Sequence, residues 1–203
     1  MPDQEPLLTR RGAIAAALAA VGGSSALLAS AAAAIPGRRS RSWARPAGGL
    51  HAWDWLIGEW KVRHRRLKAR LAGSTDWEEF DGTSTTWLSL GGLGTLDDNL
   101  LEFPGGSYRA IGVRAFDPKT RRWAVWGLDS RNPTVIQPPV FGSFENGIGT
   151  FLGDDTLNGK PITIRFLWSK ITRKSAHWEQ AFSPDGGTTW ELNWTMEFRR
   201  VGA

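Results

Sequence analysis

The sequence contains no cysteine. Without thiols the chain cannot form a disulfide, a thiolate-ligated metal site, a cysteine nucleophile or a lipid-modified N-terminal cysteine. It also contains no Gly-x-Gly-x-x-Gly loop, phosphate-binding loop, nucleophile elbow or zinc-binding signature. These absences exclude cysteine chemistry and favour a binding protein over an enzyme.

Basic residues are only slightly in excess over acidic ones, and the chain has a single tyrosine. The 203 residues hold 25 Lys and Arg against 20 Asp and Glu, for a formal charge of +5. The basic residues of the domain are dispersed, so we expect no nucleic-acid binding and only weak attraction to anionic surfaces. Tryptophan, by contrast, occurs twelve times against one tyrosine. Since a tryptophan needs a large apolar environment, the sequence predicts a well-packed core or an aromatic-lined cavity.

The first 34 residues have the features of an export signal. Arg10 and Arg11 precede an alanine-rich stretch that ends in small residues, as signal-peptidase sites do. We therefore predict a signal peptide over 1–34, of the twin-arginine type, and a periplasmic or secreted protein. We expect no stable membrane anchor after cleavage. Retention as an anchor is the alternative, because the stretch is long enough to span a bilayer.

A flexible basic linker is predicted over 35–49 and a single domain over 50–203. The domain shows short alternating apolar and polar runs separated by turn signals, which is the all-β pattern. Turns are expected at 116–120 and 183–190, and hairpins at Asn146-Gly147 and Asn158-Gly159. About ten sequential strands predict an antiparallel up-and-down barrel, because closure removes the exposed edges.

The last strand indicates which side chains face the barrel interior. One face is apolar and consists of Trp190, Leu192, Trp194, Met196 and Phe198, and Arg200 follows with the same parity. Such a row is predicted to point inward, since facing water it would promote aggregation. The aromatic residues expected to line the lumen are Trp123, Phe166, Trp168, Trp178, Phe182 and Trp194.

The stretch WDWLIGEWKV, residues 53–62, resembles the start of the calycin barrels, the lipocalins and fatty-acid-binding proteins. In those barrels a Gly-x-Trp begins the first strand and an arginine near the end of the last strand covers the tryptophan ring. Here Gly58, Trp60 and Arg200 match, with Arg199 as the alternative if a bulge shifts the parity, and the resemblance implies a cation–π contact of about 0.5–2 kcal/mol. Trp53 and Trp55 are expected on a short helix or turn that plugs the barrel.

The whole domain also resembles a bacterial lipocalin-like family of unknown function, DUF1579. The similar stretches are DWLIGEW, YRAIGVRAFDPKTRRWAVWGLD and HWEQAFSPDGGTTWELNWTMEFRR. The resemblance implies a ten-stranded calycin-like barrel. It implies no established reaction and no catalytic residues.

Polar side chains on the predicted inner face are candidates to orient a ligand. These are His64, Arg109 and Gln180. Arg109 shares a face with Ile111 and Val113 and is therefore expected to point inward, where a ligand carboxylate or an internal acid such as Asp97 or Asp129 would neutralise it. Exposure of Arg109 to solvent is the other alternative. For His64 the alternatives are a satisfied wall residue, a ligand contact or an iron ligand. Resemblance to haem-binding nitrobindin-type barrels keeps the last alternative open.

Two further motifs favour structural explanations. SPDGGTTW fits the Asp-box pattern Ser-x-Asp-x-Gly-x-Thr-Trp, in which Asp185 accepts hydrogen bonds from its own hairpin. His177 and Glu179 lie on one strand face, but their parity points outward and no third metal ligand is evident. We therefore predict no catalytic residue, no metal and no resident cofactor.

The function that these observations favour is the binding of a small hydrophobic or amphipathic molecule in the barrel lumen. An isomerase or hydrolase acting on a hydrophobic metabolite in the same cavity is the alternative, and it requires a carboxylate close to His64. The remaining alternatives are a haem-binding barrel and a filled barrel that serves as an interaction module.

Overall fold

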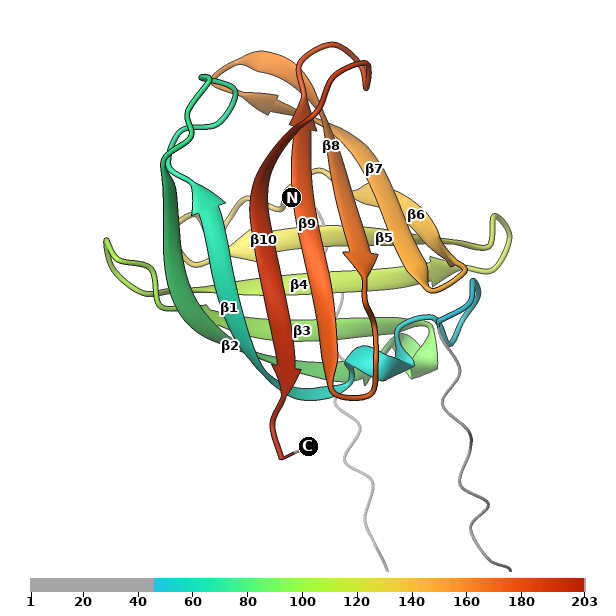
Figure 1. Ribbon diagram of the computed structural model, residues 1–203. Helices are drawn as coiled ribbons and strands as arrows, with labels where there is room; N and C mark the ends of the chain where they lie inside the picture. The colour runs from blue at the N-terminus through green and yellow to red at the C-terminus, as the bar shows by residue number, and fades with distance from the viewer. Residues whose placement is uncertain (1–45, 203) are drawn as a thin grey trace, which may run out of the picture. The chain divides into compact units, whose positions relative to one another are not determined.

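The chain forms a closed ten-stranded antiparallel barrel in which each strand pairs with its neighbours in sequence and β1 pairs with β10 (Figure 1). The computed structural model describes residues 46–202. The predicted signal peptide and most of the predicted linker lie outside the described residues. The prediction of an all-β up-and-down barrel is confirmed.

The strands are six to thirteen residues long. They are β1 Gly58–Leu67, β2 Trp77–Ser89, β3 Gly94–Leu101, β4 Tyr108–Asp117, β5 Arg122–Asp129, β6 Val140–Glu145, β7 Ile148–Leu157, β8 Lys160–Ser169, β9 Ser175–Ser183 and β10 Glu191–Arg200. Two 3₁₀ turns complete the domain, η1 at Asp54–Leu56 and η2 at Leu90–Gly92. Within residues 46–202 no helix has the length and hydrophobicity needed to cross a membrane.

The hairpin turns have the geometry that their sequences predict. Asn146 and Gly147 have φ of 52° and 81°, and Asn158 and Gly159 have φ of 51° and 75°. Positive φ at both central residues is the type I′ arrangement, which matches the twist of the flanking strands. These turns fix the registers of β6 with β7 and of β7 with β8.

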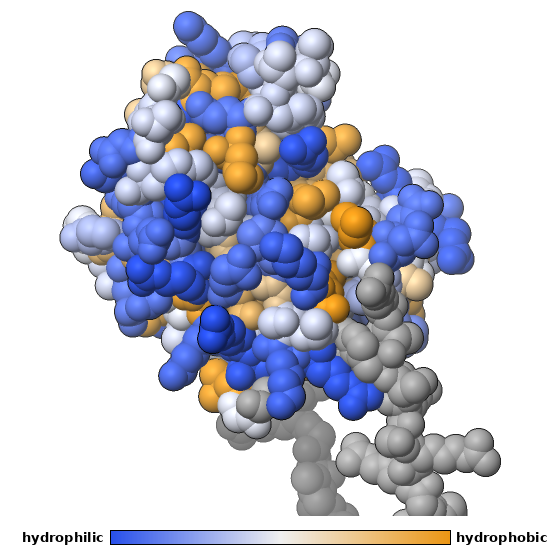
Figure 2. Space-filling view, viewed as in Figure 1, coloured by the Kyte–Doolittle hydropathy of each residue, from blue (hydrophilic) through white to orange (hydrophobic). Residues whose placement is uncertain are grey.

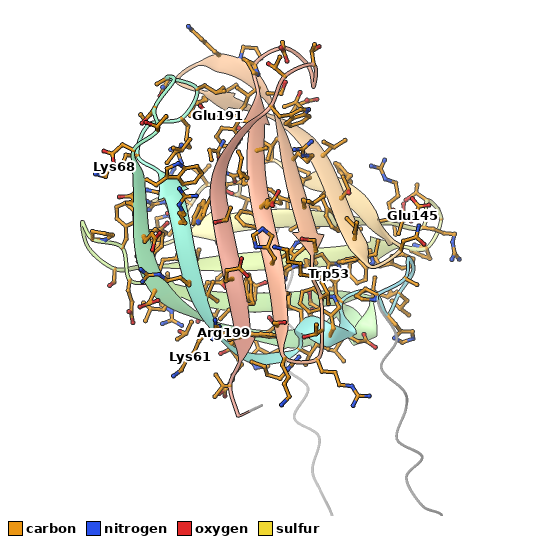
Figure 3. The ribbon with its side chains drawn as sticks, viewed as in Figure 1. Trp53, Lys61, Lys68, Glu145, Glu191 and Arg199 are labelled. Atoms are coloured by element: carbon orange, nitrogen blue, oxygen red, sulfur yellow. The ribbon has the colours of Figure 1, made fainter. Side chains whose placement is uncertain are left out.

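One end of the barrel, here called the closed end, is filled by tryptophans. Trp53, Trp55 and Trp60 are buried, and the Trp53 ring packs edge-on against Trp168 at 5.4 Å between centroids. Figure 3 shows Trp53 among side chains within the barrel. The predicted plug on a short helix is thus present, since η1 carries Trp55 and Trp53 precedes it.

The predicted contact of Arg200 with Trp60 is present at the closed end. The guanidinium carbon lies 4.2 Å from the ring centroid. The same guanidinium donates hydrogen bonds to the backbone carbonyls of Trp55 and Ile57, which ties η1 to the last strand. Gly58 has φ of 114°, and a Cβ there would lie 2.7 Å from Arg200 Nη1. Glycine is required both for this backbone conformation and for the close approach.

A β-bulge changes the inner face of the last strand. The register of β10 with β9 shifts between Leu192 and Trp194, so the inward parity predicted for the strand holds for Trp194, Met196 and Phe198 and is wrong for Trp190 and Leu192. Leu192 is 39% exposed, and Trp190 packs outside the barrel against the Arg165 guanidinium. The bulge directs Asn193 to a fully buried position in their place.

The outer surface is not uniform. Over β1, β9 and β10 it is mainly hydrophilic (Figure 2) and carries ion pairs such as Arg63 with Glu79 and Asp81. Over β2 to β5, by contrast, a row of cross-strand partners is apolar: Trp87, Leu96, Val113 and Trp126. Because Val113 is in this row, the face of β4 that carries it is the outer face.

Candidate ligand-binding cavity

The barrel lumen contains a cavity of about 470 Å³. It extends from Leu56 and Phe151 above the closed end to Arg70 and Arg131 in the connections at the other end, here called the mouth. Cavities of about 300–1,000 Å³ are typical for small-molecule sites. The twelve tryptophans therefore do not fill the lumen.

One wall of the cavity is aromatic and aliphatic. It is formed by the inward side chains of β8, β9 and β10, which are Ile162, Ile164, Phe166, Trp168, Trp178, Phe182, Trp194, Met196 and Phe198. Phe166 and Trp178 lie 5.1 Å apart between ring centroids, and Trp178 meets Trp194 edge-on at 5.9 Å. These contacts fix the ring orientations, so the wall is preformed.

The opposite wall, formed by β2, β3 and β4, is polar. Its inward side chains include Ser84, Asp97, Asn99 and Arg114. The Asp97 carboxylate accepts hydrogen bonds from Asn99 Nδ2 at 2.5 Å, from the Gly112 backbone N–H at 2.9 Å, and from Arg114 Nη1. The network is buried, since the side chains of Arg114 and Asp97 are 7% and 4% exposed.

The Asp97–Arg114 pair is a compensated charge pair within the lumen. Removing either charge would leave the other buried without a partner, which is strongly unfavourable. The Arg114 guanidinium also lies 4.5 Å from the Trp53 ring centroid, so it connects the polar wall to the closed end. Gly112 is needed here, because a Cβ at that position would lie 2.6 Å from Asp97 Oδ1.

His64 lies between the two walls and is 3% exposed. Its ring stacks on Phe80 with a centroid separation of 4.6 Å, and its Nδ1 accepts a hydrogen bond of 3.3 Å from Trp194 Nε1. Because an indole nitrogen only donates, the neutral imidazole carries its proton on Nε2. Burial and then the positive charge of Arg66 lower the pKa of His64 to about 4. At neutral pH His64 is thus an uncharged donor, and its Nε2 has no hydrogen-bond partner among the described residues.

The mouth is lined by arginines that contact aromatic rings. Arg66 donates to Glu78 Oε1 at 3.2 Å and lies 4.5 Å from the Phe103 ring centroid. Arg131 pairs with Asp129 at 2.7 Å and lies over the Tyr108 ring at 3.7 Å.

Arg70 is the third arginine of the mouth. Burial, and next the charge of Arg66, lower its pKa. Its Nε is buried without a hydrogen-bond partner among residues 46–202. The mouth therefore offers guanidinium donors that its own carboxylates do not all satisfy.

Seven of the predicted lumen residues line the cavity: His64, Gln180, Phe166, Trp168, Trp178, Phe182 and Trp194. Gln180 is partly committed, since its Nε2 donates to Asn193 Oδ1 at 2.9 Å. Trp123 was expected to line the lumen but lies in the closed end instead, where its Nε1 donates to the Gly49 carbonyl at 3.0 Å.

The predicted inward position of Arg109 is wrong. Arg109 is on the outside of β4 and forms two hydrogen bonds with Asp98, of 2.9 and 2.8 Å. The inward residues of β4 are those of the opposite parity, including Tyr108 and Arg114. The apolar character of this face was misleading, because Val113 belongs to the apolar outer row.

The polar wall and the mouth arginines were not predicted as site residues. Arg66 had a signal, because it shares parity with Trp60 and His64 on the first strand. Asp97 was predicted as an internal acid, but with Arg109 as its partner. Arg114 had no signal, since the two residues lie 17 positions apart and only the β3–β4 register brings them together.

A metal site is not supported by the geometry. Among residues 46–202 no three His, Asp or Glu side chains come together to hold an ion. His177 is on the outside of β9, as its parity predicts, and its ring nitrogens contact Glu197 at 2.5 Å and Glu179 at 2.9 Å.

Comparison with known proteins supports the architecture. No protein-family model matches the chain, and no curated protein matches it in sequence. A solved structure, the S-type phycobiliprotein lyase CPES from Guillardia theta, has a similar fold with a TM-score of 0.50. The match covers 74% of this chain and 91% of that one at 8% identity, so it shows a shared fold and nothing finer.

Proposed function

We propose that the barrel binds one small amphipathic molecule in its lumen. The observation that carries this proposal is the 470 Å³ cavity, which has an aromatic wall on β8 to β10 and a polar wall on β2 to β4. A purely apolar ligand would leave the Arg114 Nε donor of the polar wall without a partner, and a purely polar one would gain nothing from the aromatic wall. A ligand with one apolar face and hydrogen-bonding groups matches both.

The orientation of the ligand follows from the charges. Its apolar body would lie against Phe166, Trp178 and Trp194. A carbonyl or hydroxyl oxygen would accept a hydrogen bond from His64 Nε2. An acidic group, if the ligand has one, would face the mouth, where Arg70 has an unsatisfied donor.

Binding is favoured over catalysis by the surroundings of His64. A general base would need a carboxylate that orients its ring. The hydrogen bond to Nδ1 comes from Trp194 instead, and the carboxylate of Asp97 is held by Arg114, Asn99 and Gly112. The similarity to a phycobiliprotein lyase is compatible with a ligand-binding barrel and does not identify a ligand for this chain.

We also propose that the protein is exported by the twin-arginine route and belongs with the DUF1579-like barrels. The support is the sequence alone, namely Arg10-Arg11 with the alanine-rich stretch and the three similar segments. Cell fractionation followed by N-terminal sequencing tests export. A cytoplasmic protein that retains residues 1–34 would contradict it.

Native mass spectrometry with an absorption spectrum, on protein purified from a cell extract, is the direct test of binding. A co-purifying small molecule supports the proposal and gives the ligand class. A Soret band would identify that molecule as haem, and substitution of His64 would then test the iron ligand.

The site itself is tested with a fluorescent amphipathic probe, anilinonaphthalene sulfonate, and two matched variants. Met196→Trp fills part of the cavity and is expected to weaken probe binding at least about tenfold. Thr195→Trp adds the same ring one position away, on the outside of β10, and should leave binding unchanged. Equal binding by both variants, or no binding by the wild type together with no co-purifying molecule, would refute the proposal.

A further inference from the structure

The two ends of the barrel differ in charge. The connections at the closed end, including the segment before β1, contain Lys119, Arg121, Lys170, Arg173 and Lys174 against the single acid Asp54, which gives 5 − 1 = +4. The connections at the mouth contain Lys68, Arg70 and Arg131 against Asp76, Glu102 and Asp185, which gives 3 − 3 = 0. The net positive charge of the connections is therefore located at the closed end.

The exposure and pairing of the closed-end cations also matter for binding. All five are exposed. Lys119, Arg121, Lys170 and Lys174 take part in none of the ion pairs found among the described residues. The cross-strand partners Lys61 and Arg199, labelled in Figure 3, are exposed near the same end, as are the acids Glu59, Asp117 and Glu145. The net charge of the closed end therefore stays positive. A surface with this charge attracts anions at short range.

An exposed apolar turn lies beside these cations. Leu88, Leu90 and Leu93 are 56%, 62% and 42% exposed. The Phe116 backbone N–H donates to the Leu93 carbonyl at 2.8 Å, which places η2 next to the β4–β5 turn that carries Lys119 and Arg121. The leucines and the cations therefore share one surface, here called the closed-end surface.

The residue at the tip of this turn is unfavourable for folding. Leu90 has φ of 51°, in the left-handed region that glycine and asparagine tolerate far better than leucine. It is also the most exposed leucine on the closed-end surface. Neither backbone conformation nor packing accounts for a leucine at this position.

The chain enters the barrel at the same end. The Gly147 N–H, in the β6–β7 turn, donates to the Pro46 carbonyl, and the Trp123 indole donates to the Gly49 carbonyl. The segment between the predicted signal peptide and Pro46 includes Arg38, Arg39, Arg41 and Arg45. The sequence that leads to the closed end is thus basic too.

We propose that the closed-end surface docks on an anionic lipid bilayer, with the η2 leucines in the interface and the cations over the headgroups. Charge complementarity favours an anionic partner, and exposed leucines among cations favour a bilayer over a nucleic acid, which offers no apolar phase at its phosphates. In this position the mouth faces away from the membrane and stays open to the aqueous phase. The proposal does not depend on the lumen and would stand even if no ligand were found.

The electrostatic part is tested by sedimentation with vesicles of phosphatidylcholine alone and with an equal part of phosphatidylglycerol. The chain from Arg41 onward is suitable, because residues 46–202 contain all ten strands and the whole core. We expect partitioning only to the anionic vesicles, and a decrease as salt is raised. Lys170→Glu with Lys174→Glu should reduce partitioning at least about tenfold. Lys68→Glu with Lys160→Glu makes the same change of net charge at the mouth and should have little effect.

The leucine contribution is tested by Leu90→Asn. Asparagine suits the left-handed conformation, so this variant should unfold at the same or a higher temperature while losing most of its partitioning. Leu192→Asn, at an exposed leucine near the mouth, is the matched control and should partition like the wild type.

Three results would overturn the proposal. They are no partitioning of the wild type to anionic vesicles, equal partitioning of the closed-end and mouth charge variants, and binding that is indifferent to Leu90 but is competed by duplex DNA. The last result would assign the surface to a polyanion.

Discussion

We expect the stability of the barrel to fall as the pH is lowered from about 6.5 to about 4, because the unfolded chain then protonates its histidine while the buried His64 of the folded barrel stays neutral. In the folded state its pKa is about 4, against 6.5 for an ordinary histidine. Between these values the unfolded state binds the extra proton and the folded state does not. Stability therefore rises with pH across this window and is unaffected by His64 above it.

The magnitude follows from the size of the shift. A difference of 2.5 between 6.5 and about 4, at about 1.36 kcal/mol per unit, corresponds to about 3 kcal/mol lost in full below pH 4. The cause is burial, since the ring is 3% exposed and is held between Phe80 and Trp194. The effect is a large part of the about 5–15 kcal/mol that stabilises a typical domain.

Chemical denaturation at neutral pH and at steps down to about pH 4 measures this effect in the wild type and in His64→Gln. The variant has a lower absolute stability, because it loses the ring contacts. Between pH 6.5 and pH 4, however, its free energy of unfolding should decrease by about 3 kcal/mol less than that of the wild type. Parallel curves for wild type and His64→Gln would refute the assignment of a buried neutral imidazole.

Three further predictions concern the scaffold. Arg200→Met removes the cover of Trp60 and three hydrogen bonds to backbone carbonyls at the closed end, and should lower the free energy of unfolding by about 1–3 kcal/mol in a denaturation titration. Gly112→Ala forces a Cβ against a buried carboxylate and should cost about 1–3 kcal/mol by the same measurement, whereas Gly127→Ala meets only the end of an exposed glutamine side chain and should cost little. Asp185→Asn removes a carboxylate whose pKa is lowered to about 2, chiefly by hydrogen bonds within its hairpin, and should speed amide hydrogen exchange there; unchanged exchange would show that the hairpin holds without it.

The fold was largely predictable because its signals are local. Asn-Gly pairs mark two hairpins, and the Asp-box marks a third, in which Asp185 Oδ1 accepts the Thr189 N–H at 2.8 Å as expected. The Trp60–Arg200 contact could be predicted from its resemblance to calycin barrels. Strand order in an up-and-down barrel follows the sequence order, so no long-range information was needed.

The cavity walls were only partly predictable, because parity has to be assigned strand by strand. On β8 and β9 the inner face is the apolar one, and those aromatic residues were assigned correctly. On β4 the apolar Val113 belongs to the outer row, while the inner face carries the buried Arg114 beside Tyr108. On β10 a bulge changes the parity within the strand. Neither the outer apolar row nor the bulge has a signature in the sequence of a single strand.

The pairing of the first strand with the last has a consequence for how the chain folds. Trp60 pairs with Arg200, a separation of 140 residues, while every other pairing joins neighbouring strands. A growing chain can therefore form nine strands as an open meander whose two edge strands remain unpaired. Only the last strand closes the ring, and long-range pairing of this kind slows folding and leaves strand edges exposed to association in the meantime. Synthesis of β10 is thus the event that converts an aggregation-prone sheet into a barrel without edges.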